Sequence, residues 1–156
     1  GEEEVAGLGA ALESVVALAR HDPYRTKTAF HLRQPPPISI RDYVSRIRKY
    51  LDCSCECFVL CLVYIDSVIA RHRDIVVDSL SVHKLIVGSM ALAVKFQDDT
   101  RRGNKFLAEV AGIKLQDLNS LELRMLQLLD YELFVSPGVF EKYRKIVRSA
   151  ACNKTL

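Results

Sequence analysis

The sequence lacks both a long apolar run and a strong excess of charge of one sign. No segment approaches the roughly 18 uninterrupted apolar residues of a membrane-spanning helix, and the acidic start at Glu2, Glu3 and Glu4 is unlike a secretory signal. Lys and Arg number 22 against 19 Asp and Glu, so the formal net charge of +3 is too small to indicate a dedicated polyanion binder. With 156 residues, 49% of them apolar, the chain is expected to form a soluble, intracellular domain, cytoplasmic or nuclear.

The usual signatures of catalysis are also missing. There is no phosphate-binding G-x-x-x-x-G-K-[ST], no G-x-G-x-x-G, no G-x-S-x-G and no H-E-x-x-H. The 4 histidines are scattered, and the adjacent Asp98 and Asp99 have no third carboxylate at a spacing that would complete a metal shell. We interpret these two aspartates as a solvated helix end, predict no catalytic residue and expect that the protein is not an enzyme.

Cysteine is present, but its spacing is not that of a disulfide framework. Of the 5 cysteines, Cys53, Cys55, Cys57 and Cys61 lie close together. They could supply four soft metal ligands, but Cys55 points away from the helical face that the other three share, and no second Cys or His pair follows at zinc-finger spacing. We interpret them as small buried side chains in a tightly packed helix and expect no metal and no cofactor.

Glycine and proline are scarce, at 7 and 5 residues, and three of the prolines are adjacent at 35–37. Because each proline restricts the residue before it, this run predicts an extended connector after an N-terminal amphipathic helix. Segments 57–65 and 82–96 are apolar on every side, which predicts two helices that are buried on every side.

Helical spacing of apolar residues predicts the remaining elements. Amphipathic helices are expected over 40–51, 104–111 and 115–129, and a last one begins at Ser136 and Pro137. The total is about seven helices and no convincing strand, which is typical of an all-α bundle with two central helices wrapped by amphipathic ones.

Three charged residues interrupt these apolar patterns, and a charge near a core needs a partner. Asp66 ends one all-apolar run, Lys95 closes the other, and Glu122 falls on the stripe of a later amphipathic helix. Structural explanations are an ion pair of Asp66 with Arg46 or Arg48, a helix-dipole contact for Lys95 and a solvent-reaching side chain for Glu122. We favour the structural explanation for Asp66.

The same residues belong to a series of motifs that resembles the cyclin box, specifically that of the Pho80-like (P/U-type) cyclins. Each motif is weak alone, but their shared order and spacing over roughly residues 38–135 are specific. The series is Ser39-Ile40-x-x-Tyr43-x-x-Arg46-Ile47, Tyr64-Ile65-Asp66, Ser81-Val82-His83-Lys84-Leu85, Ala93-Val94-Lys95-Phe96-Gln97-Asp98-Asp99, Asn104, Ala111-Gly112-Ile113 and Leu118-Asn119-x-Leu121-Glu122.

The resemblance implies a single five-helix cyclin box over 38–135, an N-terminal helix and Pro-rich connector over 1–37, and a C-terminal helix and tail over 136–156. It implies that Lys95 and Glu122 bind the regulatory helix of a cyclin-dependent protein kinase, Pho85-like or related, and that Arg46 and Asp66 form an internal structural pair. The protein would then be an allosteric activator without catalytic activity of its own.

The chain departs from the family pattern in places. Ser67 and Lys84 stand where arginine is common. Segment 45–49 does not reproduce the Met-Arg-Ala-Ile-Leu patch of mitotic cyclins, so the sequence gives no support for a substrate-docking groove of that type.

Two other functions remain to be distinguished from kinase activation. One is a scaffold that keeps the fold without kinase binding. The other is a cyclin-fold module that binds nucleic acid or a transcription factor, like those of transcription factor IIB, although nearly balanced acidic residues count against nucleic acid, and no membrane partner is expected. Its basic face would be built from Arg41, Arg46, Arg48, Lys49, Arg71, Arg73, Arg101, Arg102 and Lys105.

Overall fold

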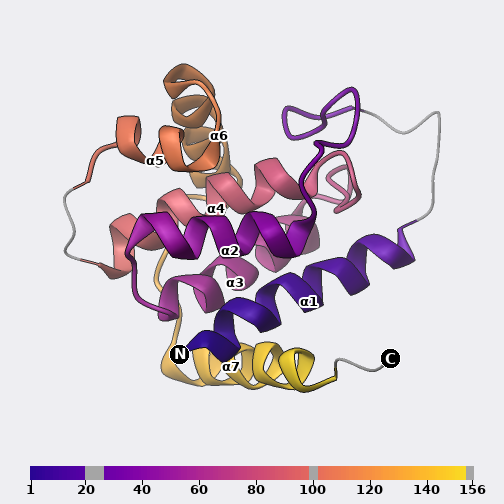
Figure 1. Cartoon of the computed structure of the whole chain (residues 1–156), viewed down its shortest axis with the longest axis vertical. Helices are drawn as coiled ribbons and strands as arrows, with labels where there is room; N and C mark the ends of the chain where they lie inside the picture. Colours follow the sequence, from indigo (N-terminus) through magenta and orange to yellow (C-terminus); the bar gives the residue numbers. More distant parts are fainter. Residues whose placement is uncertain (20–26, 99–101, 154–156) are drawn as a thin grey trace.

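The structure, a computed structural model, describes residues 1–19, 27–98 and 102–153, and these residues form α-helices and no strand (Figure 1). The all-α fold class and the order of the helices that the sequence predicted are confirmed. None of the described helices is long and apolar enough to cross a membrane. The seven helices are α1 (Glu2–Leu18), α2 (Ile40–Leu51), α3 (Glu56–Arg71), α4 (Val82–Gln97), α5 (Asn104–Ala111), α6 (Leu115–Leu128) and α7 (Pro137–Cys152).

Helices α3 and α4 form the centre of the molecule, and both are buried on nearly every side, as their sequences predicted. The cysteines of α3 are part of this packing. Cys57 and Cys61 are fully buried, and their Sγ atoms lie 3.8 Å from the carbonyl oxygen of Ala93 and 3.9 Å from that of Ile86 in α4. The interpretation as small packing residues is confirmed for these two, whereas Cys53 is buried ahead of the helix and Cys55 is the half-buried residue that precedes α3. Helices α1, α2, α6 and α7 cover the central pair.

Two glycines let helices approach closely. A Cβ atom on Gly88 of α4 would lie 2.7 Å from Cγ of Met125 and 3.3 Å from the carbonyl oxygen of Leu121, so α6 packs directly on the α4 backbone. A Cβ atom on Gly7 of α1 would overlap the backbone carbonyl of Val147 in α7. Helices α1 and α7 come from opposite ends of the chain, yet they lie side by side (Figure 1).

Serine side chains cap the starts of α2 and α7. Ser39 Oγ accepts a hydrogen bond from the Asp42 amide at 3.1 Å, and Ser136 Oγ accepts one from the Val139 amide at 3.2 Å. Asn104 does not cap α5, because Gly103 occupies the cap position and the Asn104 side chain bonds to α6 instead.

The described part of the connector, residues 27–39, contains no helix and is bound to the body of the molecule. Phe30 is buried in the core, and the Leu32 amide donates to the carbonyl oxygen of Leu80 at 2.8 Å. At the connector's end, His83 Nε2 lies 2.9 Å from the carbonyl oxygen of Ile38. This segment is therefore packed against the helices rather than projecting from them.

Candidate functional site: the α4–α6 surface

The last turn of α4 is where this buried helix reaches the surface. Its residues from Val82 to Val94 are buried apart from Lys84, whereas Lys95 and Phe96 are exposed. Because the apolar run of the sequence stops at Lys95, the helix has no further core to enter, and the last turn faces solvent.

Helix α6 contributes the other half of this surface. Leu118, Leu121 and Met125 point into the core and hold α6 against α4. Glu122 lies at the edge of this apolar stripe with a side chain that is 20% exposed, and Leu123 beside it is exposed. We refer to Lys95, Phe96, Glu122 and Leu123 as the α4–α6 surface.

The structure brings Lys95 and Glu122 into direct contact, although 27 positions separate them in the sequence. Lys95 Nζ donates a hydrogen bond to Glu122 Oε1 at 2.9 Å and lies 2.7 Å from Oε2. Oε2 is buried and makes no further hydrogen bond. The donor and the acceptor that the resemblance assigned to a partner thus bind each other here, and a partner has to share or replace this ion pair.

A second polar contact lies one helical turn from Glu122. Asn104, the first residue of α5, donates a hydrogen bond through Nδ2 to Oδ1 of Asn119 on α6 at 2.7 Å. This bond fixes the start of α5 beside the α4–α6 surface. Both asparagines belong to the motifs of the sequence, but the motifs did not indicate that the two contact each other.

Arg46 and Asp66 do not form the predicted internal pair. Arg46 faces α5 and donates from Nε to the carbonyl oxygen of Val110 at 2.8 Å. Asp66 faces α7, where its carboxylate interacts with the Tyr143 hydroxyl and with the charge of Lys142. The two side chains leave α2 and α3 toward different neighbouring helices, so the structural pair is corrected to two separate contacts.

The surroundings of Asp66 shift the acidity of both partners. Burial raises the pKa of Asp66 above its ordinary value, and the bond from Tyr143 only partly opposes this. Burial and the neighbouring Asp66 carboxylate raise the pKa of Tyr143 to about 12. Asp66 therefore interacts with a tyrosine of α7, and a structural role for Asp66 stays a prediction.

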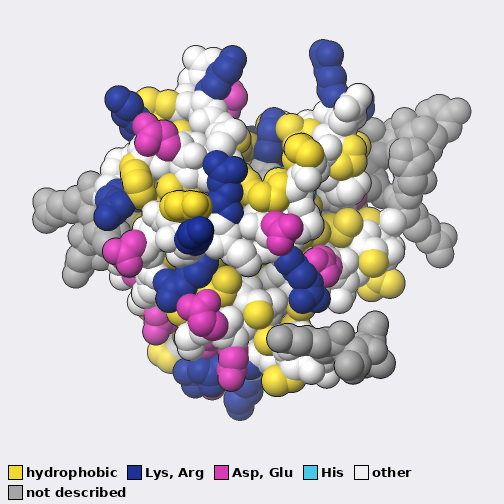
Figure 2. Space-filling model, in the orientation of Figure 1, with side chains coloured by type: hydrophobic (Ala, Val, Ile, Leu, Met, Phe, Trp, Pro, Cys, Tyr) yellow, Lys and Arg dark blue, Asp and Glu magenta, His cyan; other side chains and the backbone are white. Residues whose placement is uncertain are grey.

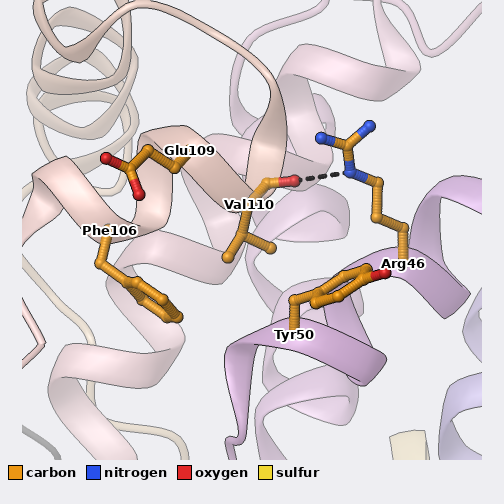
Figure 3. A pocket seen from close by; sticks show the side chains of 5 residues that line it. All are labelled: Arg46, Tyr50, Phe106, Glu109 and Val110. Carbon is orange, nitrogen blue, oxygen red and sulfur yellow. Dashed lines mark hydrogen bonds between the residues drawn. The ribbon is translucent and has the colours of Figure 1, made fainter.

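Arg46 instead lies in the wall of a hollow between α2 and α5 (Figure 3). This hollow has a volume of about 610 Å³ and is lined by Arg46, Tyr50, Phe106, Glu109 and Val110. Figure 3 shows the guanidinium bonded to the Val110 carbonyl, with the aromatic rings of Tyr50 and Phe106 below it. The hollow is separate from the Lys95 pair, and its lining combines two aromatic rings with one positive and one negative side chain.

Of the eight described residues of the proposed basic face, three have an acidic partner. Arg41 Nε lies 2.8 Å from Glu13, Arg48 Nε lies 3.2 Å from Glu2, and Arg71 Nη2 lies 3.7 Å from Glu132. Arg102 lies over the Phe106 ring at 4.5 Å. Figure 2 shows Lys and Arg interspersed with Asp and Glu on the face in view. Asp99 and Arg101 lie outside the described residues.

Asp98 is the clearest polar contact that sequence reasoning missed. We expected a solvated helix end, but Asp98 accepts two hydrogen bonds from Ser54, which is 44 positions earlier. No local pattern links the two residues, so only the packing of α3 on α4 reveals the contact. Within the described ranges, no group of three or more His, Cys, Asp or Glu side chains is placed to hold a metal ion.

Comparison with known proteins agrees with this architecture. Residues 10–133 match the family model of the cyclins. The chain is 46% identical over 115 residues to Cyclin-U1-1 of Arabidopsis thaliana, covering 74% of this chain and 55% of that protein. It is 37% identical over 122 residues to Cyclin-P4-1 of Oryza sativa subsp. japonica, covering 78% and 58%. The chain thus spans little more than half the length of these relatives, and the family match begins within α1 rather than at residue 38.

Proposed function

Because the chain belongs to the cyclin family, we propose that it binds a cyclin-dependent protein kinase through the α4–α6 surface and activates that kinase. The Lys95–Glu122 ion pair carries this proposal. It places a positive donor and a negative acceptor side by side on the surface formed by two helices that a close backbone approach holds together.

The chemistry of this pair suits the end of a helix in a partner protein. A helix end has backbone amides or carbonyls without partners inside the helix, and a lysine with a glutamate can satisfy one of each. The exposed rings and methyl groups of Phe96 and Leu123 supply apolar area that a partner helix can bury. Docking would move the regulatory helix of the kinase so that its glutamate meets the ATP-positioning lysine.

The internal ion pair sets the energy scale of docking. Lys95 and Glu122 already satisfy each other, so a kinase gains only the difference between its own hydrogen bonds and those it replaces. The side chain of Lys95 is 45% exposed, which makes the internal pair worth at most about 1 kcal/mol and therefore easy to exchange. Apolar burial by Phe96 and Leu123 would then supply much of the affinity.

The resemblance to the Pho80-like cyclins, together with the likeness to the P- and U-named relatives, supports a Pho85-like or related kinase as the partner. The experiment is to mix the purified chain with a panel of purified cyclin-dependent kinases and to follow phosphorylation of a peptide substrate. Stimulation of at least one kinase is expected. No stimulation by any kinase, combined with binding to duplex DNA that weakens as salt is added, would instead support the nucleic-acid-binding module.

Substitutions on the α4–α6 surface test whether this surface binds the kinase. Lys95→Ala and Glu122→Ala are expected to weaken kinase binding in a titration, while Lys145→Ala on the distant α7 leaves it unchanged. Lys145 is a suitable control because it is an exposed lysine on a helix that does not form the α4–α6 surface. Equal affinity of all the variants would remove Lys95 and Glu122 from the site.

A further inference from the structure

The last turn of α4 is not held in place by apolar burial. The helix is enclosed as far as Val94, and beyond it Lys95, Phe96 and Gln97 are exposed. Helix ends fray where packing and capping stop, because the last carbonyls have no partners within the helix. A lysine that presents its ammonium group in a fixed direction needs another support at this point.

Asp98 supplies such a support from the residue that ends α4. Its Oδ2 accepts a hydrogen bond from the Ser54 amide at 2.9 Å, and its Oδ1 accepts one from Ser54 Oγ at 2.6 Å. A carboxylate at the C-terminus of its own helix is electrostatically unfavourable, so its position calls for compensation. Two charge-assisted hydrogen bonds provide it, and the carboxylate also lies near the start of α3, where negative charge is favoured.

The start of α3 depends on this carboxylate in turn. Cys55 is the cap residue of α3 and makes no side-chain capping bond. Next to it, Cys57 Sγ lies 3.8 Å from the carbonyl oxygen of Ala93 and 3.5 Å from Ser54 Oγ. The start of α3 and the residues before it therefore contact α4 on both sides of Lys95, with Cys57 at Ala93 and Ser54 at Asp98.

From this arrangement we infer that Asp98 is a positioning residue for kinase docking, because its bonds to Ser54 hold the last turn of α4 so that Lys95 meets Glu122 and the kinase. The inference rests on the proposed function, since it concerns the same α4–α6 surface. Asp98 acts through Lys95, and its partner Ser54 lies just before the start of α3.

The test compares two variants that leave Lys95 and Glu122 untouched. Asp98→Asn removes the negative charge that strengthens both bonds and leaves one acceptor oxygen in place of two, and Ser54→Ala removes the hydroxyl while keeping the backbone amide. Asp74→Asn and Ser45→Ala, which change exposed residues elsewhere, are the matched controls. With the kinase that the wild-type chain stimulates most, Asp98→Asn is expected to weaken binding by about three- to thirtyfold, and both controls are expected to bind like wild type.

A double-mutant cycle separates positioning from general stability. If Asp98 acts through Lys95, Asp98→Asn causes no further loss of affinity when Lys95→Ala is already present. Asp98→Asn still lowers the thermal stability both with and without Lys95→Ala. Unchanged affinity of Asp98→Asn, or the same loss in both backgrounds, would overturn the inference. If Asp98→Asn fails to fold, Ser54→Ala takes its place in the cycle, because it removes only one of the two bonds. Its loss of affinity is then compared with and without Lys95→Ala.

Hydrogen exchange of the free chain gives a readout that needs no kinase. Faster exchange of the amides of Lys95, Phe96 and Asp98 in Asp98→Asn, with unchanged exchange in the middle of α4, is expected. Unchanged exchange at these amides would overturn the inference whatever the kinase data. If the wild-type chain stimulates no kinase at all, the proposed function fails and the docking role of Asp98 fails with it, while the exchange data still report whether Asp98 holds α4.

Discussion

Two ion pairs join helices that are far apart in the chain, and they differ in their surroundings rather than in their geometry. Between α1 and α7, Arg148 Nη2 lies 3.0 Å from Glu4 Oε1, and between α4 and α6, Lys95 Nζ lies 2.7 Å from Glu122 Oε2. In each pair the basic side chain is nearly half exposed and the glutamate is largely buried, at 6% for Glu4 and 20% for Glu122.

The neighbours of each pair indicate what it does. Near Glu4 the two helices touch backbone to backbone at Gly7 and Val147, and the neighbouring Val5 is buried. Around Glu122 the neighbouring Leu123 and Phe96 are exposed. An interhelical ion pair is therefore not by itself a sign of function. Its meaning depends on whether the apolar groups beside it are already buried.

The largest expected effect lies at the α1–α7 contact. In Gly7→Ala the added methyl group overlaps the Val147 carbonyl and has to push the helices apart, which should lower the free energy of unfolding by ~3 kcal/mol. Urea unfolding measures this. Gly138→Ala in α7, where a Cβ atom would meet nothing within 4 Å, is the control and should be neutral or slightly stabilising. Equal stability of the two variants would show that α1 and α7 are not in close contact.

The next effect distinguishes the two ion pairs directly. Lys95→Ala and Glu122→Ala should each weaken kinase binding by ~1 to 3 kcal/mol and change unfolding by less than about 1 kcal/mol. Glu4→Ala should show the reverse, because it leaves Arg148 without its buried partner but lies away from the α4–α6 surface. Isothermal titration and urea unfolding of the three variants give the two quantities. A loss of kinase affinity in Glu4→Ala equal to that in Glu122→Ala would contradict the distinction.

A smaller effect tests the corrected partner of Asp66. Asp66→Ala should lower the free energy of unfolding by about 1 kcal/mol, because it removes the interaction of the carboxylate with the Tyr143 hydroxyl. Asp66→Asn keeps an acceptor and removes a charge that burial disfavours, so at neutral pH it should be at least as stable as wild type. A double-mutant cycle with Arg46→Ala should show no coupling. Coupling of Asp66 to Arg46 instead of Tyr143 would restore the original pairing.

The smallest effect is a dependence on pH at the connector. Burial lowers the pKa of His83, which lies 2.9 Å from the Ile38 carbonyl oxygen, below its ordinary value of 6.5. The unfolded chain therefore binds a proton more readily, so the contribution of neutral His83 is complete above pH 6.5 and is lost as pH falls toward the lowered pKa. Chemical unfolding at several pH values should show this decline, and His83→Gln should make it shallower. An identical decline in the variant would assign it to other groups.

Local chemistry was sufficient to predict most of the fold. Periodicity placed α2 and α5 at their observed bounds because an apolar face at helical spacing is a short-range signal. Two all-apolar segments became the central helices, since a helix without a polar side has to be enclosed. The apolar patterns also singled out Lys95 and Glu122, because each is a charged residue that interrupts one of them.

What sequence reasoning missed are contacts between residues that are distant in the chain. The pairing of Arg46 with Asp66 was wrong because the direction in which each side chain leaves its helix depends on how α2 and α3 pack. Asp98 was read as solvated because nothing near it in sequence indicates Ser54. The ion pair between Lys95 and Glu122 was also not predicted, because each was expected to meet a kinase rather than the other.

The amino-acid sequence by itself determined that this protein is helical, which helices are central and which charges are out of place, because these properties follow from the order of neighbouring residues. The tertiary structure alone decided which charge meets which, because side-chain partners are chosen by helices that approach one another across the core. It pairs Glu122 with Lys95, brings Tyr143 next to Asp66 and joins Asp98 to Ser54. The surface proposed to bind a kinase is built from such contacts between distant segments.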